Sequence, residues 1–509
     1  MTQSSGAQNI ARCLYGWGWR LATPLLGSYL LYRSLWQPEY RQHWDERFGY
    51  WRTPSNTPDT HSYHTGQVRP LWVHAVSVGE TAAVLPLLRQ CAAAWPEVPI
   101  LLTHGTPTGR ATGALRLKDL PGRIAQSYLP YDLPGAVERF FQHWNPAIGL
   151  IVETEVWPNL VAAANRHQVP LIAVNARLSP RSLARGQRFR SLIEPAVRGY
   201  SMIIAQTQDD AERIAHLGQR PEFVTGNLKF DQPADFVLQA RGRGWRKRFG
   251  DRLVILAAST REGEEALVLE SWQRVMQHRD PRLGGIGDSL PPMLIIVPRH
   301  PNRFEAVARL ITRHMGEAPM QRKALDDPNT DFSHCNVLLG DSMGEMQAWY
   351  AAADVTVMGG SLLPFGSQNL IEANAAGCPV VLGPSVYNFQ QAAEASILFS
   401  ASIQVSDPRE AIPVALELAA DTARRGAMSE AGAAFAQAHR GSLERTLEAI
   451  GPLMESALGP PVAPLVTAPP QVELCRATPA RWPCSTRQGP SDNRRQPRCR
   501  RRRARRWLP

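Results

Sequence analysis

The chain of 509 residues repeats one unit: a short apolar run, a turn rich in glycine or polar residues, and then a helix-like stretch. This rhythm is typical of a parallel sheet whose strands are joined by crossover helices. Because 509 residues exceed what one hydrophobic core can hold, we expect at least two domains. Five runs in each half are apolar enough to be strands: 71–75, 100–103, 148–152, 171–174, 202–205, 253–257, 293–297, 336–339, 355–358 and 380–382.

These runs predict an α/β protein with two doubly wound, Rossmann-like domains that face each other across a cleft. Ligands of such sheets bind beyond the carboxyl ends of the strands. We predict a division into an anchor at 1–36, an N-terminal domain at 37–235, a C-terminal domain at 236–450 and a disordered tail rich in Pro and Arg at 451–509.

The formal net charge of +11 is concentrated in the tail. Residues 457–509 hold twelve arginines but only two acidic residues, Glu473 and Asp492, so the body of the chain is nearly neutral. A nearly neutral body gives little support to a folded nucleic-acid binder. Binding of an anionic surface or nucleic acid through the tail stays open as an alternative from another class.

The seven cysteines show no CxxC or Cys/His spacing, which favours free thiols. The sequence accordingly predicts no metal site and no cofactor.

The amino terminus contains an apolar stretch of twelve residues, 21–32, between Arg20 and Arg33. A helix needs roughly 20 such residues to cross a bilayer, so a spanning helix is not expected. Tyr and Trp residues on either side suit the headgroup boundary of a membrane, which favours an interfacial anchor. The alternative is a buried amphipathic helix of the first domain.

Carboxylates follow two predicted strands of the first half. Glu80 comes after the run at 71–75, at a predicted helix start, where it could act as a general base or could simply complement the helix dipole. Glu153 and Glu155 follow the run at 148–152. At the end of the strand we expect the two side chains to point to opposite sides, so that only one of them faces the cleft. A solvated loop is the competing interpretation.

Two further segments carry cations, residues 175–179 (NARLS) with Arg177 and residues 226–231 (GNLKFD) with Lys229. Fixed cations at a cleft can stabilise developing negative charge. Exposed Lys and Arg are more often simply solvated.

Three turns of the second half suit a nucleotide phosphate: Arg299 after the run at 293–297, residues 340–345 (GDSMGE), and glycines at 359–360 followed by 366–372 (GSQNLIE). Glycine allows close approach of backbone amides, and a helix amino terminus favours an anion. The chain has neither a P-loop motif nor a true GxGxxG after a strand, which argues against kinases and dehydrogenases.

Taken together, these segments resemble the Kdo transferases, bacterial enzymes that attach 3-deoxy-D-manno-octulosonic acid during lipid A and lipopolysaccharide assembly. The resemblance covers roughly residues 15–447. The strings that carry it, in order, are HAVSVGE (74–80), YLPYDLP (128–134), ETEVWPNL (153–160), NARLS (175–179), GNLKFD (226–231), VPRHP (297–301) and GDSMGE (340–345).

The resemblance implies a GT-B glycosyltransferase that is inverting and independent of metal, with the acceptor on the N-terminal domain and CMP-Kdo on the C-terminal one. It makes Glu80 the general base, and Glu153 and Lys229 groups that support the transition state. The donor is CMP-Kdo and the acceptor a lipid A precursor, which places the enzyme at the cytoplasmic face of the inner membrane. The implied CMP contacts are Pro298, Arg299, Met343, Gly344, Glu345, Asn369, Leu370, Ile371 and Glu372.

The chain departs from the family pattern at two places. Residues 366–369 read GSQN where the family usually has GGHN, and the arginine-rich tail extends beyond the usual end. Within enzymes, a GT-B transferase that uses a UDP-sugar stays open. The sequence determines neither the number of Kdo residues added, nor the acyl pattern of the acceptor, nor the oligomeric state.

Overall fold

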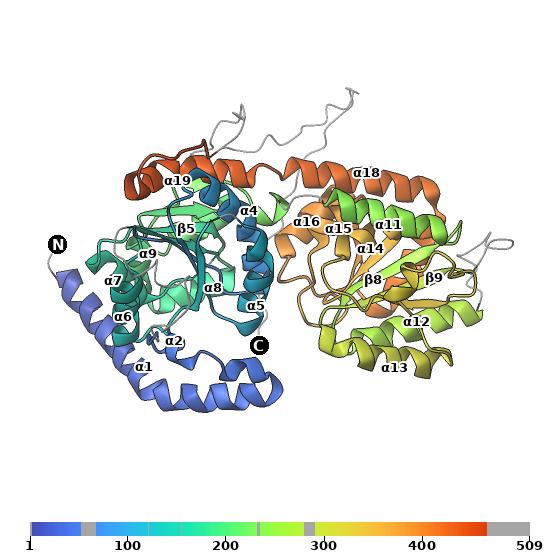
Figure 1. Ribbon diagram of the computed structural model, residues 1–509, viewed down its shortest axis with the longest axis horizontal. Coiled ribbons are helices and arrows are strands. Elements are labelled where there is room, and N and C mark those ends of the chain that lie inside the picture. Colours follow the sequence, from blue (N-terminus) through green and yellow to red (C-terminus); the bar gives the residue numbers. More distant parts are fainter. Residues whose placement is uncertain are drawn as a thin grey trace, which may run out of the picture.

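The computed structural model describes two halves that lie side by side, each built around one sheet (Figure 1). The predicted tail lies outside the described residues from position 466 onward, as does its arginine run. The described residues are 3–51, 68–120, 122–153, 155–231, 235–278 and 291–465.

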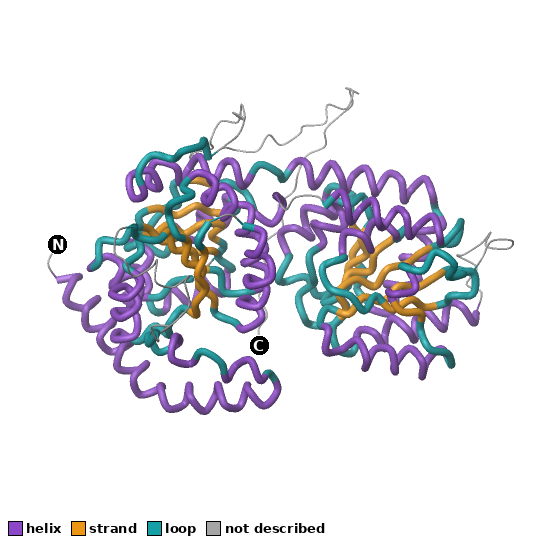
Figure 2. The backbone as a smooth tube through the Cα atoms, in the orientation of Figure 1, coloured by secondary structure: helices purple, strands orange, loops and turns teal. Residues whose placement is uncertain are grey.

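The first sheet has seven parallel strands in the order β3-β2-β1-β4-β5-β6-β7. Its central strands β1, β4 and β5 are buried along their whole length. Helices cover both faces, which is why these strands are continuously apolar rather than alternating (Figure 2). The strands are β1 (Leu71–His74), β2 (Ile100–His104), β3 (Ile124–Tyr128), β4 (Ile148–Val152), β5 (Leu171–Ala176), β6 (Met202–Ala205) and β7 (Phe223–Val224).

The helices of the first half mostly begin with a proline or with a side chain that caps the helix. Ser77, Thr106, Ser179 and Thr207 each accept a hydrogen bond from a backbone N–H in the first turn of the helix that follows. The helices are α1 (Gln3–Trp36), η1 (Pro38–Arg41), α2 (Trp44–Arg47), α4 (Val78–Ala94), α5 (Pro107–Arg116), η2 (Leu117–Asp119), α6 (Pro134–Trp144), α7 (Pro158–Arg166), α8 (Pro180–Arg188), α9 (Arg190–Arg198), α10 (Gln208–Ala215) and η3 (Leu228–Asp231).

The second sheet also has seven parallel strands, in the order β10-β11-β9-β8-β12-β13-β14. The two expected Rossmann-like, doubly wound domains are therefore confirmed. Apolar clusters fill both faces of this sheet, one of them around Trp245 and Trp349 and the other around Trp272. The strands are β8 (Val254–Thr260), β9 (Met293–Pro298), β10 (Met320–Gln321), β11 (Val337–Leu339), β12 (Val355–Met358), β13 (Val380–Leu382) and β14 (Ser402–Gln404).

The helices of the second half alternate with these strands and end in two long segments that run along one side of the molecule (Figure 1). They are α11 (Phe236–Arg248), α12 (Glu264–His278), η5 (Pro301–Arg303), α13 (Phe304–Met315), η6 (Arg322–Leu325), α14 (Met346–Ala352), α15 (Leu370–Ala375), α16 (Gln390–Leu398), η7 (Pro408–Glu410), α17 (Ala411–Ala420), α18 (Thr422–Ala438) and α19 (Ser442–Leu458).

The last helix, α19, corrects the predicted division of the chain. Its apolar residues Leu447, Ile450 and Met454 are buried in the core of the first half, whereas α18 lies on the second (Figure 1). Asp231 fixes the start of α19, because its carboxylate accepts hydrogen bonds from the backbone N–H groups of Gly441 and Leu443. The second domain therefore ends before this helix, and residues 451–458 are helical rather than part of a tail.

The first helix, α1, has two unlike faces. One face docks on the loop after β3, where Trp19 stacks on Tyr131 with a centroid distance of 6.2 Å and Leu30 is fully buried. The other face exposes a stripe of apolar residues at helical spacing, which we call the α1 stripe: Ile10, Leu14, Trp17, Leu21, Leu25, Tyr29, Tyr32, Leu35 and Trp36. Among the described helices, none is both long enough and apolar enough to cross a bilayer.

Candidate active site

The two sheets share the feature that places ligands in doubly wound folds. In the first sheet β1 lies between β2 and β4, and in the second β8 lies between β9 and β12. In each sheet the later strands are therefore added on both sides of the first strand, so the connections run in opposite directions from it. Such a switch point opens a crevice beyond the carboxyl ends of the two central strands. Almost all of the predicted site residues lie on loops at these carboxyl ends.

Glu80 lies at the first switch point, in the first turn of α4. Its Oε2 accepts a hydrogen bond from the backbone N–H of Val76 at 2.7 Å, and its Oε1 accepts one from the Ser77 hydroxyl at 2.9 Å. The Glu80 N–H in turn donates to Ser77 Oγ, so the pair forms a reciprocal cap. Burial, followed by the nearby Glu153, raises the pKa of Glu80.

Glu153 lies across this switch point from Glu80, directly after β4, and forms an ion pair with Lys229. The Lys229 ammonium lies 2.7 Å from Glu153 Oε1, and both side chains are largely buried. Lys229 belongs to η3, which is fixed because Asn175 Oδ1 accepts the N–H of Leu228. The structure thus brings together the three residues predicted to be catalytic. Lys229 forms an ion pair with Glu153, and the charges of both residues act on the pKa of Glu80.

Glu155 lies close enough to Glu80 and Glu153 for their charges to raise its pKa. The backbone of Glu153 has a φ of 61°, in the left-handed region, so β4 has ended at this residue. Burial, and then the charge of Glu80, raise the pKa of Glu155 to about 7. The Trp157 indole N–H donates to its Oε2 at 2.5 Å.

The second switch point carries positive charge instead. Arg261 directly follows β8 and Arg299 directly follows β9, and burial together with the Arg261 charge lowers the pKa of Arg299. Glu264 ties the loops together, because its carboxylate accepts the backbone N–H groups of Arg261, Gly360, Leu362 and Leu363. Arg261 was not predicted, although its position at the end of the first strand of this sheet could have indicated it.

Glycine at the second switch point is required by packing as well as by any ligand. A Cβ on Gly359 would lie 2.5 Å from the carbonyl oxygen of Ser259, so only glycine lets the loop after β12 pass the end of β8.

The loop after β11 holds Met343, Gly344 and Glu345. Met343 is exposed, and Gly344 has a φ of 81°, which leaves its backbone open on one side. The Glu345 side chain is committed to ion pairs with Arg322 at 2.7 Å and Arg241 at 2.8 Å, which hold its pKa at about 2. Any contact of Glu345 with a nucleotide therefore falls to its backbone.

The segment 369–372 starts α15 and combines core and polar residues. Leu370 and Ile371 are buried in the core of the second half, and Ile371 also lines a small cavity between the halves. Asn369 caps the helix by accepting the N–H of Ile371 and donates to Glu372 Oε1 at 3.0 Å. Burial raises the pKa of Glu372, while Arg116 of the first half and Arg299 act in the opposite direction.

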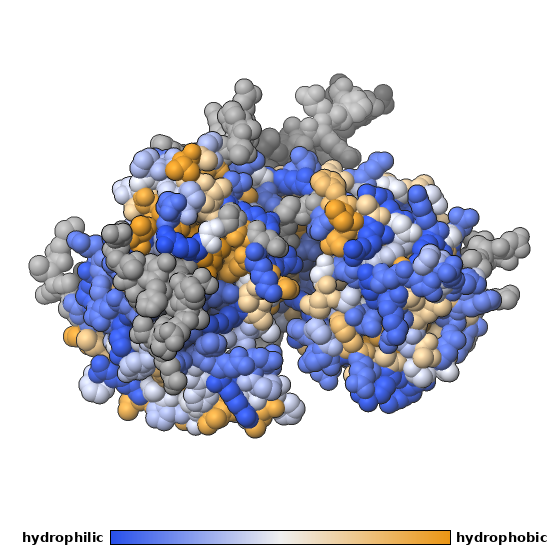
Figure 3. Space-filling model, viewed as in Figure 1, coloured by the Kyte–Doolittle hydropathy of each residue, from blue (hydrophilic) through white to orange (hydrophobic). Residues whose placement is uncertain are grey.

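A small cavity lies between the two halves. It is lined by Lys229 and Phe230 of the first half and by Ile371 and Glu372 of the second, together with Gln239, Gln347, Ala375 and Arg440. The ring of Phe389, also from the second half, lies 5.6 Å from the Lys229 ammonium. The surface view shows a notch between the two halves at one side of the molecule (Figure 3).

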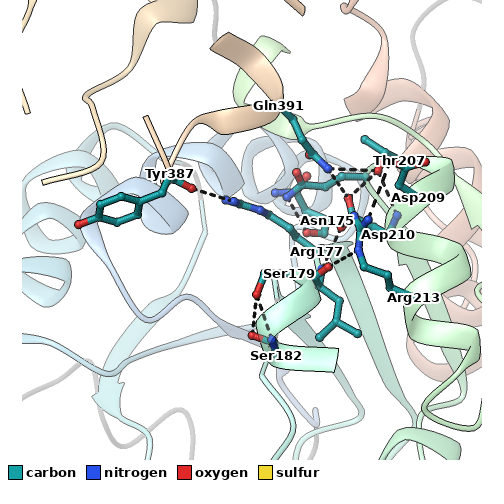
Figure 4. A network of polar contacts seen from close by, with 12 residues as sticks. Asn175, Arg177, Ser179, Ser182, Thr207, Asp209, Asp210, Arg213, Tyr387 and Gln391 are labelled. Atoms are coloured by element: carbon teal, nitrogen blue, oxygen red, sulfur yellow. Dashed lines mark hydrogen bonds and ion pairs between the residues drawn. The ribbon is translucent and has the colours of Figure 1, made fainter. Parts of the chain in front are cut away.

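Arg177 does not join the acids but links the two halves. Its guanidinium donates to the carbonyl oxygens of Tyr387 at 3.2 Å and Asn388 at 3.1 Å (Figure 4). Nearby, Gln391 of the second half donates to Asp210 Oδ2 of the first at 3.3 Å (Figure 4). These contacts fix how closely the two switch points approach each other.

In the part of the chain that the structure describes, no group of three or more His, Cys, Asp or Glu residues could hold a metal ion. The described cysteines are free thiols, and three of the four are buried.

Two doubly wound domains, each with a switch point at the carboxyl ends of its strands, define the GT-B fold. The same fold occurs in UDP-N-acetylglucosamine 2-epimerases from Neisseria meningitidis (TM-score 0.51, 13% identity, 76% of this chain and 100% of that one) and Listeria monocytogenes (TM-score 0.50, 16% identity, 76% and 97%). At this identity the likeness concerns the fold alone.

Sequence relatives narrow the class. The family model of 3-deoxy-D-manno-octulosonic-acid transferases, the Kdo transferases, matches residues 42–232. The 3-deoxy-D-manno-octulosonic acid transferase of Bordetella pertussis is 44% identical over 75% of this chain and 86% of its own. That of Haemophilus influenzae is 31% identical over 86% and 97%. The chain therefore belongs to the Kdo transferase family and is a glycosyltransferase.

Proposed function

We propose that this enzyme transfers Kdo from CMP-Kdo to a lipid A precursor, with inversion at the anomeric carbon and Glu80 as general base. The observation that carries the proposal is the combination of an acidic switch point in one half, around Glu80 and Glu153, with a basic one in the other, around Arg299. An acceptor hydroxyl needs a base, and an anionic donor needs fixed cations, so the two halves divide these tasks.

Glu80 is suited to remove the acceptor proton. The N–H of Val76 and the hydroxyl of Ser77 hold its carboxylate in one orientation. Its raised pKa makes it a stronger base than a solvated carboxylate. A base on the acceptor side, opposite the leaving nucleotide, is the arrangement that an inverting displacement requires.

Lys229 and Glu153 act beside this base. The ammonium supplies a fixed positive charge next to two carboxylates, and its ion pair with Glu153 holds it in place. In the other half, Arg299 stabilises the negative charge that builds up on CMP as it leaves. Backbone groups of residues 343–345 and the Asn369–Glu372 pair complete the nucleotide side.

The α1 stripe suits a membrane surface, where a lipid acceptor resides. Nine large apolar or aromatic residues face outward along one helix, and Figure 3 shows apolar side chains gathered along the edge of the molecule where Figure 1 places α1. Such a face inserts into the headgroup boundary without crossing the bilayer. We therefore place the enzyme on the cytoplasmic face of the inner membrane, held by α1.

The test is a transfer assay with purified full-length protein, CMP-Kdo and a tetra-acylated lipid A precursor, with and without a chelator, in which the lipid product is weighed by mass spectrometry. A mass increase by one or more Kdo units is expected, unchanged by the chelator. A parallel reaction with UDP-N-acetylglucosamine is expected to leave the lipid unchanged. Product from the UDP-sugar but not from CMP-Kdo would overturn the donor assignment.

A further inference from the structure

Two arginines at the second switch point carry charges that no described carboxylate neutralises through an ion pair. They are Arg261 after β8 and Arg299 after β9, and they lie close enough for the charge of one to lower the pKa of the other. Both side chains are only partly exposed. Two like charges placed together at a partly buried edge are unfavourable unless an anion completes the site.

The neighbouring carboxylates are committed elsewhere. Both carboxylate oxygens of Glu264 accept hydrogen bonds from backbone N–H groups of the switch-point loops, four in all. Glu265 pairs with Arg303 at 2.9 Å and accepts the hydroxyl of Thr260 at 2.9 Å. The arginines nearby that serve the fold, such as Arg303 and Arg322, all have such partners. Arg261 and Arg299 are thus the exception within this described region.

Arg261 is held in place by two uncharged contacts. Its guanidinium lies over the ring of Phe365 at 4.9 Å, and its Nη1 lies 3.2 Å from Nε2 of His300. For Nη1 to donate, that imidazole nitrogen must be unprotonated. Burial and the surrounding arginines lower the pKa of His300 to about 4, so the ring is neutral, and Nε2 accepts in the tautomer that carries its proton on Nδ1. The contacts orient Arg261 and leave its charge unneutralised.

CMP-Kdo, the donor in the proposed function, carries two negative groups, the carboxylate of the sugar and the phosphate of the nucleotide. In an activated ulosonic acid, the carboxylate carbon and the phosphate oxygen are bonded to the same anomeric carbon. The two negative groups are therefore neighbours, as the two guanidinium groups are. Arg299 also lies near Glu372 and Tyr350, on the side of the segment expected to hold the nucleotide, whereas Arg261 lies toward Phe365 and His300.

We propose that Arg261 binds the carboxylate of the donor sugar and so selects acid sugars, while Arg299 binds the phosphate of the nucleotide. This inference rests on the proposed function, since it takes CMP-Kdo as donor. Arg261 is then a specificity-determining residue, and CMP alone, which has the phosphate but no sugar carboxylate, does not use it.

The test compares Arg261→Gln with Arg299→Gln in the full-length enzyme, using the KM for CMP-Kdo and the inhibition constant of CMP. Arg261→Gln is expected to raise the KM for CMP-Kdo about 10- to 100-fold and to change the inhibition constant of CMP less than about 3-fold. Arg299→Gln is expected to raise both. Arg309→Gln, an exposed arginine on α13, is the matched control and is expected to change neither.

The outcomes separate the inference from the function on which it rests. If the parent enzyme transfers Kdo but Arg261→Gln weakens CMP as much as CMP-Kdo, or weakens neither, the carboxylate assignment is wrong and the function stands. If the parent enzyme does not use CMP-Kdo, the proposed function fails first. Should Arg261→Gln not fold, Arg261→Lys, which keeps the charge but loses the planar fork, must show the same selective loss.

Discussion

The carboxyl edges of the two sheets have the same central geometry and opposite charge. After β1 and β4 come Glu80, Glu153 and Glu155, with Lys229 as the cation among them. After β8 and β9 come Arg261 and Arg299, with Glu264 turned toward backbone amides. In the function proposed above, one fold used twice provides a proton acceptor in one half and an anion site in the other. The strand order sets where a ligand binds, and the loop residues set which ligand.

The largest expected effect concerns the acidic edge. Glu80→Gln is expected to lower kcat by about 10²–10⁴-fold, because the amide keeps the shape and removes the proton acceptor. The inhibition constant of CMP, which reports on the basic edge, is expected to stay unchanged. Glu97→Gln, an exposed glutamate of the same half, is the control. Activity within about tenfold of the parent would assign Glu80 to helix capping alone.

The pH profile sharpens this assignment. Because burial and Glu153 raise the pKa of Glu80, its carboxylate takes up a proton at a higher pH than a solvated glutamate does. The rate at saturating substrate is expected to fall as the pH drops through that raised pKa, and the residual rate of Glu80→Gln is expected to lack this limb. An identical acid limb in the variant would place the titrating group elsewhere, with Glu155 as the first candidate.

A smaller loss is expected from the single cation of the acidic edge. Lys229→Met removes a fixed charge beside the base and leaves Glu153 unpaired, so kcat is expected to fall by about 10²–10³-fold with little change in the KM for CMP-Kdo. Lys118→Met, at an exposed site, is the control. A change confined to the KM for CMP-Kdo would show that Lys229 acts in donor binding rather than beside the base. The functional contrast between the two halves would then be weaker.

The basic edge is expected to respond through binding. Arg299→Gln removes a charge-assisted contact worth about 1.5–3 kcal/mol, which corresponds to a loss of about 10- to 100-fold in CMP affinity. Isothermal titration with CMP measures it directly on the full chain. Arg313→Gln, an exposed arginine of α13, is the control. Equal CMP affinity in the variant and the parent would show that Arg299 does not bind the phosphate of CMP.

The smallest effect on chemistry is expected from α1, which lies outside both edges. Leu21→Asp combined with Leu25→Asp places charges in the α1 stripe and is expected to release the protein from vesicles of anionic lipid, by at least about tenfold in partitioning. Turnover on detergent-dispersed acceptor is expected to change little. Val462→Asp, an exposed apolar residue away from α1, is the control. Unchanged sedimentation with vesicles would show that the stripe does not hold the membrane.

The strands show how far the sequence alone reaches. All ten predicted runs are strands, and four strands were not predicted: β3, β7, β10 and β14. Each of the four lies at an edge of its sheet. A central strand of a parallel sheet is buried on both faces and must be apolar, whereas an edge strand is short or partly exposed and carries no such mark. The loop positions of the catalytic acids followed from the central strands and so were predictable.

The sequence by itself determined two parallel sheets, their central strands and the loops that carry Glu80, Glu153 and Arg299, because strands buried on both faces are continuous apolar runs in the chain. Only the tertiary structure decided which side chains on those loops are free. It placed Glu155 within reach of the charge of Glu80, paired Glu345 with Arg322 and Arg241, buried Leu370 and Ile371, and packed α19 on the first half. These outcomes depend on contacts between residues far apart in the chain, which local pattern does not encode.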